Sequence, residues 1–205
     1  MPSPTDDRAA VFSNIRQGLA KHEGKPKTAL PEWDSSVVVC RPPREFASPT
    51  DYFRFRFEAT AGIVVDGWEA LSAFLQTKEV QCGYVDPAFA EAVKGFPFAI
   101  EHEFDRARVD EYQFGITKAT AAIAETGSML LTETDSSSRL GALSPWLHVA
   151  VLEKSSIFPD MPSAIASFGS ERSTLFVTGP SKTADVEGIL IQGVHGPGIQ
   201  VCCLV

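Results

Sequence analysis

Apolar residues near the start of the chain recur at three- and four-residue intervals, which predicts a helix over about Thr5–His22. The pattern then gives way to a polar stretch rich in proline. Within it, only Val37–Cys40 reads as a short strand or an extended packing segment. We therefore expect residues 1–50 to form an N-terminal helical arm with an irregular segment, and residues 51–205 to form the main domain.

Beyond the arm, the pattern alternates between the helical period and the strand period. The segment Phe53–Phe57, FRFRF, fits both, because it alternates strictly but also lies within a helical window. The expected helices cover residues 51–61, 68–76, 87–94 and 161–168, and the expected strands cover residues 63–66, 80–85, 121–124, 128–132, 146–152, 174–178 and 199–205. This alternation predicts an α/β fold in which helices cover a mostly parallel sheet.

The composition is that of an ordinary globular protein, with 44% hydrophobic and 21% charged residues. The first residues, MPSPTDDRAAVF, lack the basic and apolar regions of a signal peptide, and no run of apolar residues is long enough to span a membrane. We therefore expect a cytoplasmic protein without a membrane span.

The net charge of −8 argues against nucleic-acid binding, which depends on clustered cations. A local basic pocket for a small anion remains compatible with this charge. The four cysteines form no C-x-x-C pair, and the histidines show no H-x-x-H or H-E-x-x-H spacing. The sequence thus predicts reduced, structural thiols and no metal site.

Loop-forming residues are concentrated in Thr178–Gly198, directly after a strand-like run. Ser181 or Thr183 can cap a short helix that has Asp185 and Glu187 in its first turn. A strand, a loop of small residues and a helix N-terminus together favour an anion site. A well-capped turn is the alternative interpretation.

Two histidines lie in suggestive positions. In the GVHGP segment, His195 can be presented to a cleft or can be a plain surface residue, whereas His148 opens a strand and is expected to be buried with its ring bonded to backbone. Ser181, Asp185 and His195 can be written as a catalytic triad. The sequence gives that triad no support, because the G-x-S-x-G elbow is absent.

A charged residue, Glu125, interrupts the apolar run AAIAETGSMLL. Because burying an unpaired carboxylate is costly, Glu125 must be exposed at a turn, paired or functional. Arg139 is the candidate partner, either for Glu125 or for the carboxylate of a ligand. It can equally be a solvated loop cation.

Several fragments occur together in a specific order: GIT (115–117), AIAETG (122–127), Arg139, LSPWLHV (143–149), TGPSKTADVE (178–187) and GVHGP (193–197). This set resembles the LUD domain, specifically the lactate utilization protein C family, over about residues 110–205. The resemblance implies a fold similar to that of sugar-phosphate isomerases, CoA transferases and formyltetrahydrofolate cyclo-ligase. It also implies a part in bacterial oxidation of L-lactate to pyruvate, alongside two partner proteins that carry iron–sulfur clusters.

By this resemblance the chain is an accessory, non-cluster component of the lactate system, and electron transfer resides in the iron–sulfur partners. No cofactor is predicted to be bound by this chain itself, although a small anion or a nucleotide- or CoA-type molecule is a candidate ligand. The alternatives are a stand-alone transferase or ligase acting on a CoA ester, nucleotide or folate, and a metabolite-sensing module.

The resemblance also implies a site at the carboxyl ends of the strands. Its catalytic candidates are Glu125 and His195, where Glu125 is a nucleophile by analogy with CoA transferases. The ligand-binding candidates are Thr126, Gly127, Arg139, Gly179, Ser181, Thr183 and Asp185. One departure is Thr120, at a position where the family usually carries an acidic residue.

Overall fold

The computed structural model describes residues 4–21, 46–132, 138–167, 173–184 and 189–205. The chain divides into two compact units, residues 1–41 and residues 42–205, which are considered separately. In the first unit, α1 spans Pro4–Ala20, so the predicted N-terminal helix is present. The proposed short strand at Val37–Cys40 lies outside the described residues.

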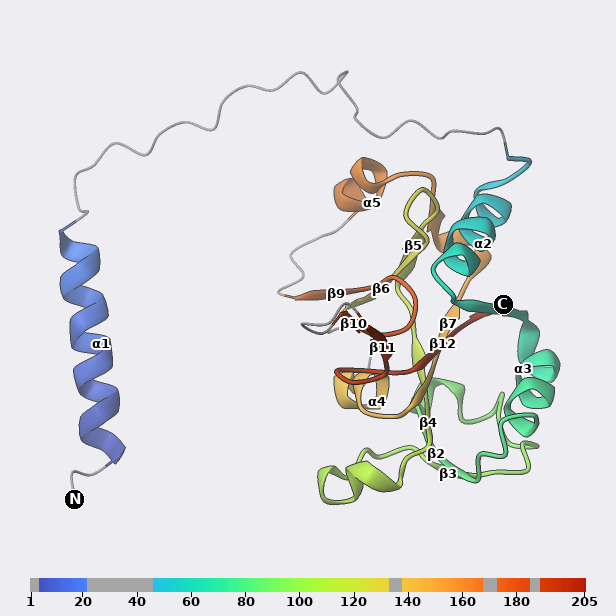
Figure 1. The fold of residues 1–205 in the computed structure, drawn as a ribbon, viewed down its shortest axis with the longest axis horizontal. Helices are drawn as coiled ribbons and strands as arrows, with labels where there is room; N and C mark the ends of the chain where they lie inside the picture. Colours follow the sequence, from blue (N-terminus) through green and yellow to red (C-terminus); the bar gives the residue numbers. More distant parts are fainter. Residues whose placement is uncertain (1–3, 22–45, 133–137, 168–172, 185–188) are drawn as a thin grey trace. The chain divides into compact units, whose positions relative to one another are not determined.

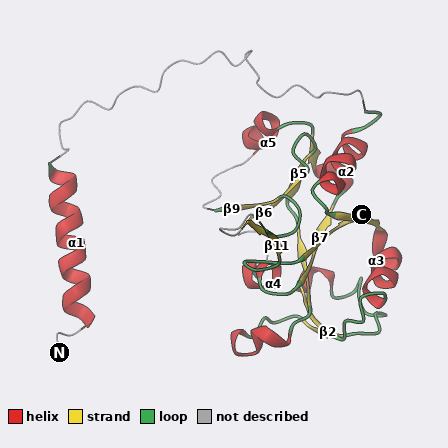
Figure 2. Ribbon diagram, in the orientation of Figure 1, coloured by secondary structure: helices red, strands yellow, loops and turns green. Residues whose placement is uncertain are grey.

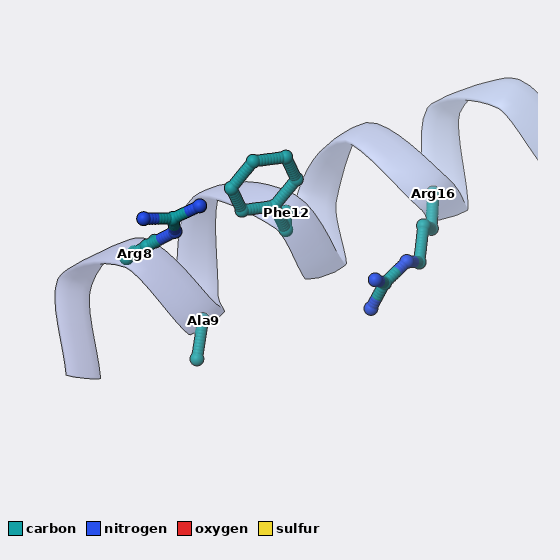
Figure 3. Close-up of a pocket in the computed structure, with 4 residues that line it drawn as sticks. All are labelled: Arg8, Ala9, Phe12 and Arg16. Atoms are coloured by element: carbon teal, nitrogen blue, oxygen red, sulfur yellow. The ribbon is translucent and has the colours of Figure 1, made fainter. Parts of the chain in front are cut away.

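Helix α1 exposes its apolar side chains, including Phe12 and Leu19, which are 44% and 65% accessible. The guanidinium carbon of Arg8 lies 5.4 Å from the centre of the Phe12 ring (Figure 3). A shallow hollow on this helix is lined by Arg8, Ala9, Phe12 and Arg16 alone. Because a single helix cannot enclose a ligand, the hollow is not a candidate site.

The second unit is built on a six-stranded sheet in which every strand pair is parallel (Figures 1 and 2). In spatial order the strands are β1 (Ile63–Asp66), β12 (Ile199–Leu204), β7 (Leu147–Leu152), β4 (Phe114–Lys118), β2 (Cys82–Val85) and β3 (Ala99–Glu101). This arrangement confirms the predicted α/β fold with a mostly parallel sheet.

The FRFRF segment is helical and lies within α2 (Pro49–Ala59). The helix begins at Ser48, whose side chain accepts a hydrogen bond from the Asp51 backbone N–H. Phe53 and Phe57 are four residues apart and fully buried, whereas Phe55 between them is 40% exposed. Burial therefore follows the helical period, which excludes the strand alternative.

The alternating side chains of β7 and β12 build two cores, one on each face of the sheet. Helix α2 packs on the face that carries Ala150 and Leu152. Helix α3 (Gly67–Gln76) packs on the opposite face, which carries Val149 and Val151. Helices thus cover the two faces of the central strands.

A second sheet has the order β8-β5-β6-β9, and a separate hairpin joins β10 to β11. Their bounds are β5 (Ala121–Ile123), β6 (Ser128–Thr132), β8 (Ile157–Phe158), β9 (Thr174–Val177), β10 (Lys182–Ala184) and β11 (Leu190–Gln192). The chain passes from β4 to β5 through Ala119 and Thr120. Their backbone N–H groups donate to Val151 O at 2.8 Å and Leu130 O at 2.8 Å.

The remaining elements are short: α4 (Arg139–Leu143), α5 (Met161–Ser167) and the 3-10 turns η1 (Pro87–Phe89), η2 (Arg106–Glu111) and η3 (Lys154–Ser156). Among the described helices, none is long and apolar enough to cross a membrane.

One predicted helix is wrong. The helix expected over residues 87–94 is only the turn η1, in which Asp86 and Pro87 supply a good start but turns follow after Phe89. Directly after Ser181 the chain forms β10, because Lys182–Ala184 pairs antiparallel with Leu190–Gln192. The first turn expected for the next helix, with Asp185 and Glu187, lies outside the described residues.

Candidate ligand site

The AETG turn joins β5 to β6 and lies against helix α2. Gly127 has φ +66, and a Cβ atom there would lie 2.6 Å from the Phe57 backbone nitrogen. The Thr126 hydroxyl donates to Ser128 Oγ at 2.8 Å, and the Ser128 and Thr178 hydroxyls are hydrogen-bonded at 2.7 Å. A chain of hydroxyl groups therefore joins this turn to the residue that follows β9.

Glu125 is half-buried, and its Oε1 accepts a hydrogen bond from the Met161 backbone N–H at 2.8 Å, at the start of α5. The exposed Arg139 has a different neighbour, since its Nη2 donates to Ser173 O at 3.5 Å. The structure therefore does not bring Glu125 and Arg139 together as an ion pair.

The TGPSK segment packs against the end of α2. Gly179 has φ +81, and a Cβ atom there would lie 2.5 Å from Thr60 Oγ1. Lys182 Nζ donates to Thr60 O at 2.7 Å. Since only glycine fits both the backbone angle and the close approach, Gly179 is explained by packing.

The GVHGP segment lies beside Ser181. The Ser181 N–H donates to Pro197 O at 2.9 Å, and the Gly193 N–H donates to Ser181 O at 3.0 Å. Ser181 and the loop that carries the exposed His195 are thus adjacent. Thr183 pairs with Ile191 in the hairpin, whereas Asp185 lies outside the described residues, so the structure leaves the triad incomplete.

The same loop lies on the indole ring of Trp146. A Cβ atom at Gly193 or at Gly198 would overlap that ring. Trp146 is 55% exposed and also lines an open hollow of about 420 Å³ near the amino ends of β2, β4 and β7. The Trp146 side chain was missed by the sequence reading, although it lies inside the LSPWLHV fragment.

The predicted location at the carboxyl ends of the strands is wrong for part of this set. GVHGP leads into β12, and Arg139 belongs to the helix that precedes β7, so both lie on the side where these strands begin. The AETG segment joins β5 to β6 in the second sheet, and the TGPSK segment follows β9 of that sheet and leads into β10. A segment that enters a parallel strand cannot lie at its carboxyl end.

The carboxyl ends of β4, β7 and β12 carry a different feature, a cavity of about 160 Å³. Its lining combines polar and apolar side chains: Phe89, Lys118, Ala119, Thr120, Val151, Glu153, Ser156 and Val205. Lys118 and Ser156 were missed by the sequence reading. One feature of the sequence could have identified Lys118: it directly follows the GIT fragment and so lies at the end of a strand.

His148 is fully buried at the centre of the parallel sheet. Its Nε2 lies 2.8 Å from Thr117 Oγ1, and its Nδ1 lies 2.8 Å from the Gln200 side-chain nitrogen. Burial lowers the pKa of His148 to about 4, while the Gln200 hydrogen bond acts in the opposite direction. His148 is therefore a neutral core residue, as expected, although its ring partners are side chains rather than backbone.

The described cysteines are free and dispersed. Cys202 and Cys203 are buried in β12, and burial raises the pKa of Cys202 well above its usual value and that of Cys203 to about 12. Cys82 is half-buried in β2. Within the described ranges, no three His, Cys, Asp or Glu side chains gather as a metal-binding group.

The protein is an α/β domain of the LUD class. Its parallel sheet is covered by helices and is joined to a smaller sheet and a hairpin, which carry the ordered turn motifs. The sequence profile of the LUD domain matches residues 65–205, and the chain belongs to this family.

The relatives agree with this assignment. Lactate utilization protein C of Bacillus subtilis is 35% identical over 98 residues, which is 44% of this chain and 41% of that protein. Lactate utilization protein C of an Exiguobacterium species is 30% identical over 173 residues, or 80% of this chain and 68% of that protein. In matches such as the first, this chain spans less than half of the relative's length.

A solved structure shares the fold. The crystal structure of a DUF162 family protein from Deinococcus radiodurans aligns with a TM-score of 0.58 at 18% sequence identity. The alignment covers 80% of this chain and all of that one.

Proposed function

We propose that this chain is an accessory component of a bacterial L-lactate utilization system, which works with partner proteins that carry iron–sulfur clusters. The observation that carries the proposal is the LUD domain over residues 65–205, together with relatives named lactate utilization protein C.

The positions of the three described cysteines support assigning the clusters to partner proteins. A cluster held by protein needs several thiolates within reach of one another. Here Cys202 and Cys203 point to opposite faces of a buried strand, and Cys82 belongs to β2, which is separated from β12 by β7 and β4. These thiols pack the sheet, and their raised pKa values favour the neutral form.

The contacts of Glu125 favour this proposal over a stand-alone transferase. A nucleophilic carboxylate needs an open line of approach to its substrate. One oxygen of Glu125 already accepts the first N–H of α5, which gives the residue a structural task.

Growth on L-lactate tests the proposed role. Deleting the gene should prevent growth with L-lactate as the only carbon source and leave growth on glucose unchanged. A plasmid copy of the full chain should restore growth. Normal growth of the deletion strain on L-lactate, with uptake and oxidation rates equal to those of the parent, would contradict the proposal.

A further inference from the structure

The cavity at the carboxyl edge of the central sheet has the position and lining of a small-molecule site. It lies where β4, β7 and β12 end, next to the point at which the chain leaves the first sheet through Ala119 and Thr120. In open α/β sheets, ligands bind outside the carboxyl ends of the strands. No residue of the AETG, TGPSK or GVHGP segments lines this cavity.

The size of the cavity limits the ligand. Its volume of about 160 Å³ is larger than the share of a single water, which is about 30 Å³, and smaller than the roughly 300–1,000 Å³ of pockets for drug-sized ligands. A molecule of about six heavy atoms fits. A whole nucleotide or CoA does not.

The lining contains one cation, one carboxylate and a hydroxyl group, beside an apolar wall. Lys118 is the last residue of β4, while Glu153 and Ser156 belong to the segment that follows β7. The Glu153 carboxylate and the Ser156 hydroxyl have no polar partner among the described residues. Phe89, Ala119 and Val151 supply the apolar wall.

Two other acids lie on this edge, and both already have partners. Asp66 is the last residue of β1, and its carboxylate lies 2.9 Å from the Arg54 Nη2 atom and 3.7 Å from the Lys154 ammonium nitrogen. The buried Asp86 directly follows β2, and its Oδ1 accepts a hydrogen bond from the Ala88 N–H at 3.0 Å. Neither Asp66 nor Asp86 lines the cavity.

We propose that this cavity binds a short-chain 2-hydroxycarboxylate, with Lys118 holding the carboxylate and with Glu153 and Ser156 contacting the hydroxyl group. An ammonium group is a suitable donor to a carboxylate, and a carboxylate is a strong acceptor for a hydroxyl proton. The short alkyl group packs on Phe89, Ala119 and Val151. The choice of a hydroxy acid among small carboxylates rests on the proposed function.

Calorimetric titration of the purified full chain tests this site with three probes: L-lactate, propionate and inorganic phosphate. We expect L-lactate to saturate one site. Propionate should bind about tenfold more weakly, because it lacks the hydroxyl group that meets a charged acceptor. Phosphate should show no saturable binding, because its additional negative charge would meet Glu153.

Variants then assign the residues. Lys118→Gln should weaken L-lactate binding about tenfold or more, and Ser156→Ala about threefold. Lys94→Gln is the matched control, because Lys94 is an exposed lysine outside the cavity, and it should bind like the unaltered chain. Circular dichroism verifies that each variant is folded. If Lys118→Gln does not fold, Ser156→Ala still tests the site.

The absence of saturable L-lactate binding would overturn the proposal, as would equal affinity of the unaltered, Lys118→Gln and Ser156→Ala chains. Equal affinity for L-lactate and propionate would overturn the role of the hydroxyl group. These outcomes are separate from the growth experiment. If the deletion strain grows normally on L-lactate while Lys118-dependent binding is measured, the proposed function fails and the site remains.

Discussion

At the scale of single residues, the buried His148 makes the free energy of unfolding depend on pH. Its pKa is about 4 in the folded chain and about 6.5 in an unfolded one, so the unfolded chain takes up the proton first as the pH falls. The neutral ring favours folding above pH 6.5. That contribution is lost between about pH 6.5 and 4, and the total loss is about 3 kcal/mol.

Urea unfolding at pH 7.5 and at pH 4.5 measures this loss. We predict that the unaltered chain loses more stability between these two pH values than His148→Gln does, because the variant cannot take up that proton. The carboxylates that titrate in the same range are common to both chains and cancel in the comparison. Equal losses in the two chains would contradict the buried, neutral assignment of His148.

Gly127 shows how one residue fixes the AETG turn. Its φ of +66 disfavours any other residue, and an added Cβ would meet the backbone of Arg56 and Phe57. We predict that Gly127→Ala lowers the free energy of unfolding by about 2–5 kcal/mol, since it combines left-handed strain with overpacking. Chemical denaturation gives this value.

Gly95→Ala is the matched control, because an added Cβ there meets nothing within 4 Å and its φ is not positive. That change should stay within about 0.5 kcal/mol of the unaltered chain. Similar stabilities of the two variants would show that the turn is not held against α2.

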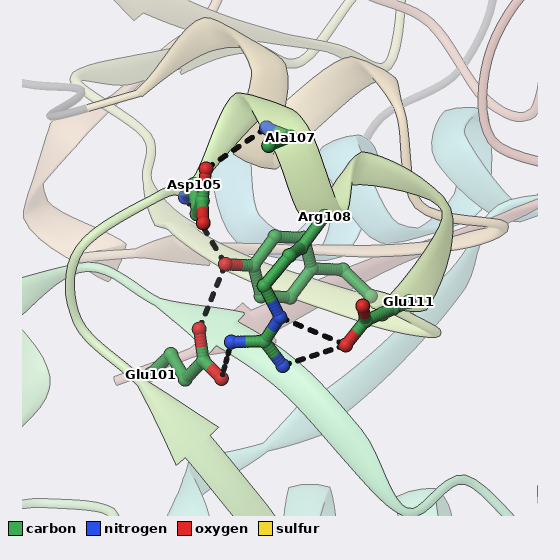
Figure 4. A network of polar contacts seen from close by, with 6 residues as sticks. Glu101, Asp105, Ala107, Arg108 and Glu111 are labelled. Atoms are coloured by element: carbon green, nitrogen blue, oxygen red, sulfur yellow. Dashed lines mark hydrogen bonds and ion pairs between the residues drawn. The ribbon is translucent and has the colours of Figure 1, made fainter.

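At the scale of elements, the turn η2 is held in place by a polar network (Figure 4). The Arg108 guanidinium donates to Glu101 at 2.7 Å and to Glu111 at 2.6 Å, and the Tyr112 hydroxyl donates to Glu101 at 2.8 Å. The Tyr112 hydrogen bond, and next the Arg108 guanidinium, lower the pKa of Glu101. Burial is the main cause of the raised pKa of Tyr112.

Removing the centre of this network should loosen the turn without unfolding the domain. We predict that Arg108→Gln speeds hydrogen exchange at the backbone amides of Asp105 and Ala107 and leaves exchange in β7 unchanged. Arg106→Gln is the control, because the Arg106 side chain makes no polar contact with the described residues. Unchanged exchange in Arg108→Gln would mean that the hydrogen bonds to the Tyr112 hydroxyl and the Asp105 carboxylate hold η2 without Arg108.

Elements with a strong local pattern could be predicted from the sequence. Strand β1 has the predicted bounds, Ile63–Asp66, because an apolar run there ends at a polar residue before a glycine. Strand β3 and helix α4 were not predicted. They have three and five residues, too few to show a period, and their pairing and packing partners are distant in the sequence.

The candidate site was only partly predictable for the same reason. The ordered turn motifs identified the family, but the contact of Glu125 with Met161 depends on a helix 36 residues further along the chain. The edge on which a loop lies depends on strand direction and order, which the motifs do not encode. Lys118 could be assigned to the cavity only once β4, β7 and β12 were seen to end together.

At the scale of the whole molecule, the two cores lie on opposite faces of one parallel sheet, and the two ends of that sheet differ. Trp146 and the GVHGP loop lie where the strands begin. The cavity with Lys118 lies where they end. The proposed function and the proposed site together place small-molecule binding on this chain and electron transfer on iron–sulfur partner proteins.

Affinity capture of the tagged full chain from source cells grown on L-lactate tests this division of labour most directly, with the eluate analysed by mass spectrometry and for iron. The account predicts that cysteine-rich iron–sulfur proteins are recovered with bound iron, and that the chain purified alone contains none. Recovery of the chain by itself, without iron, from cells that are actively oxidising L-lactate would contradict the account.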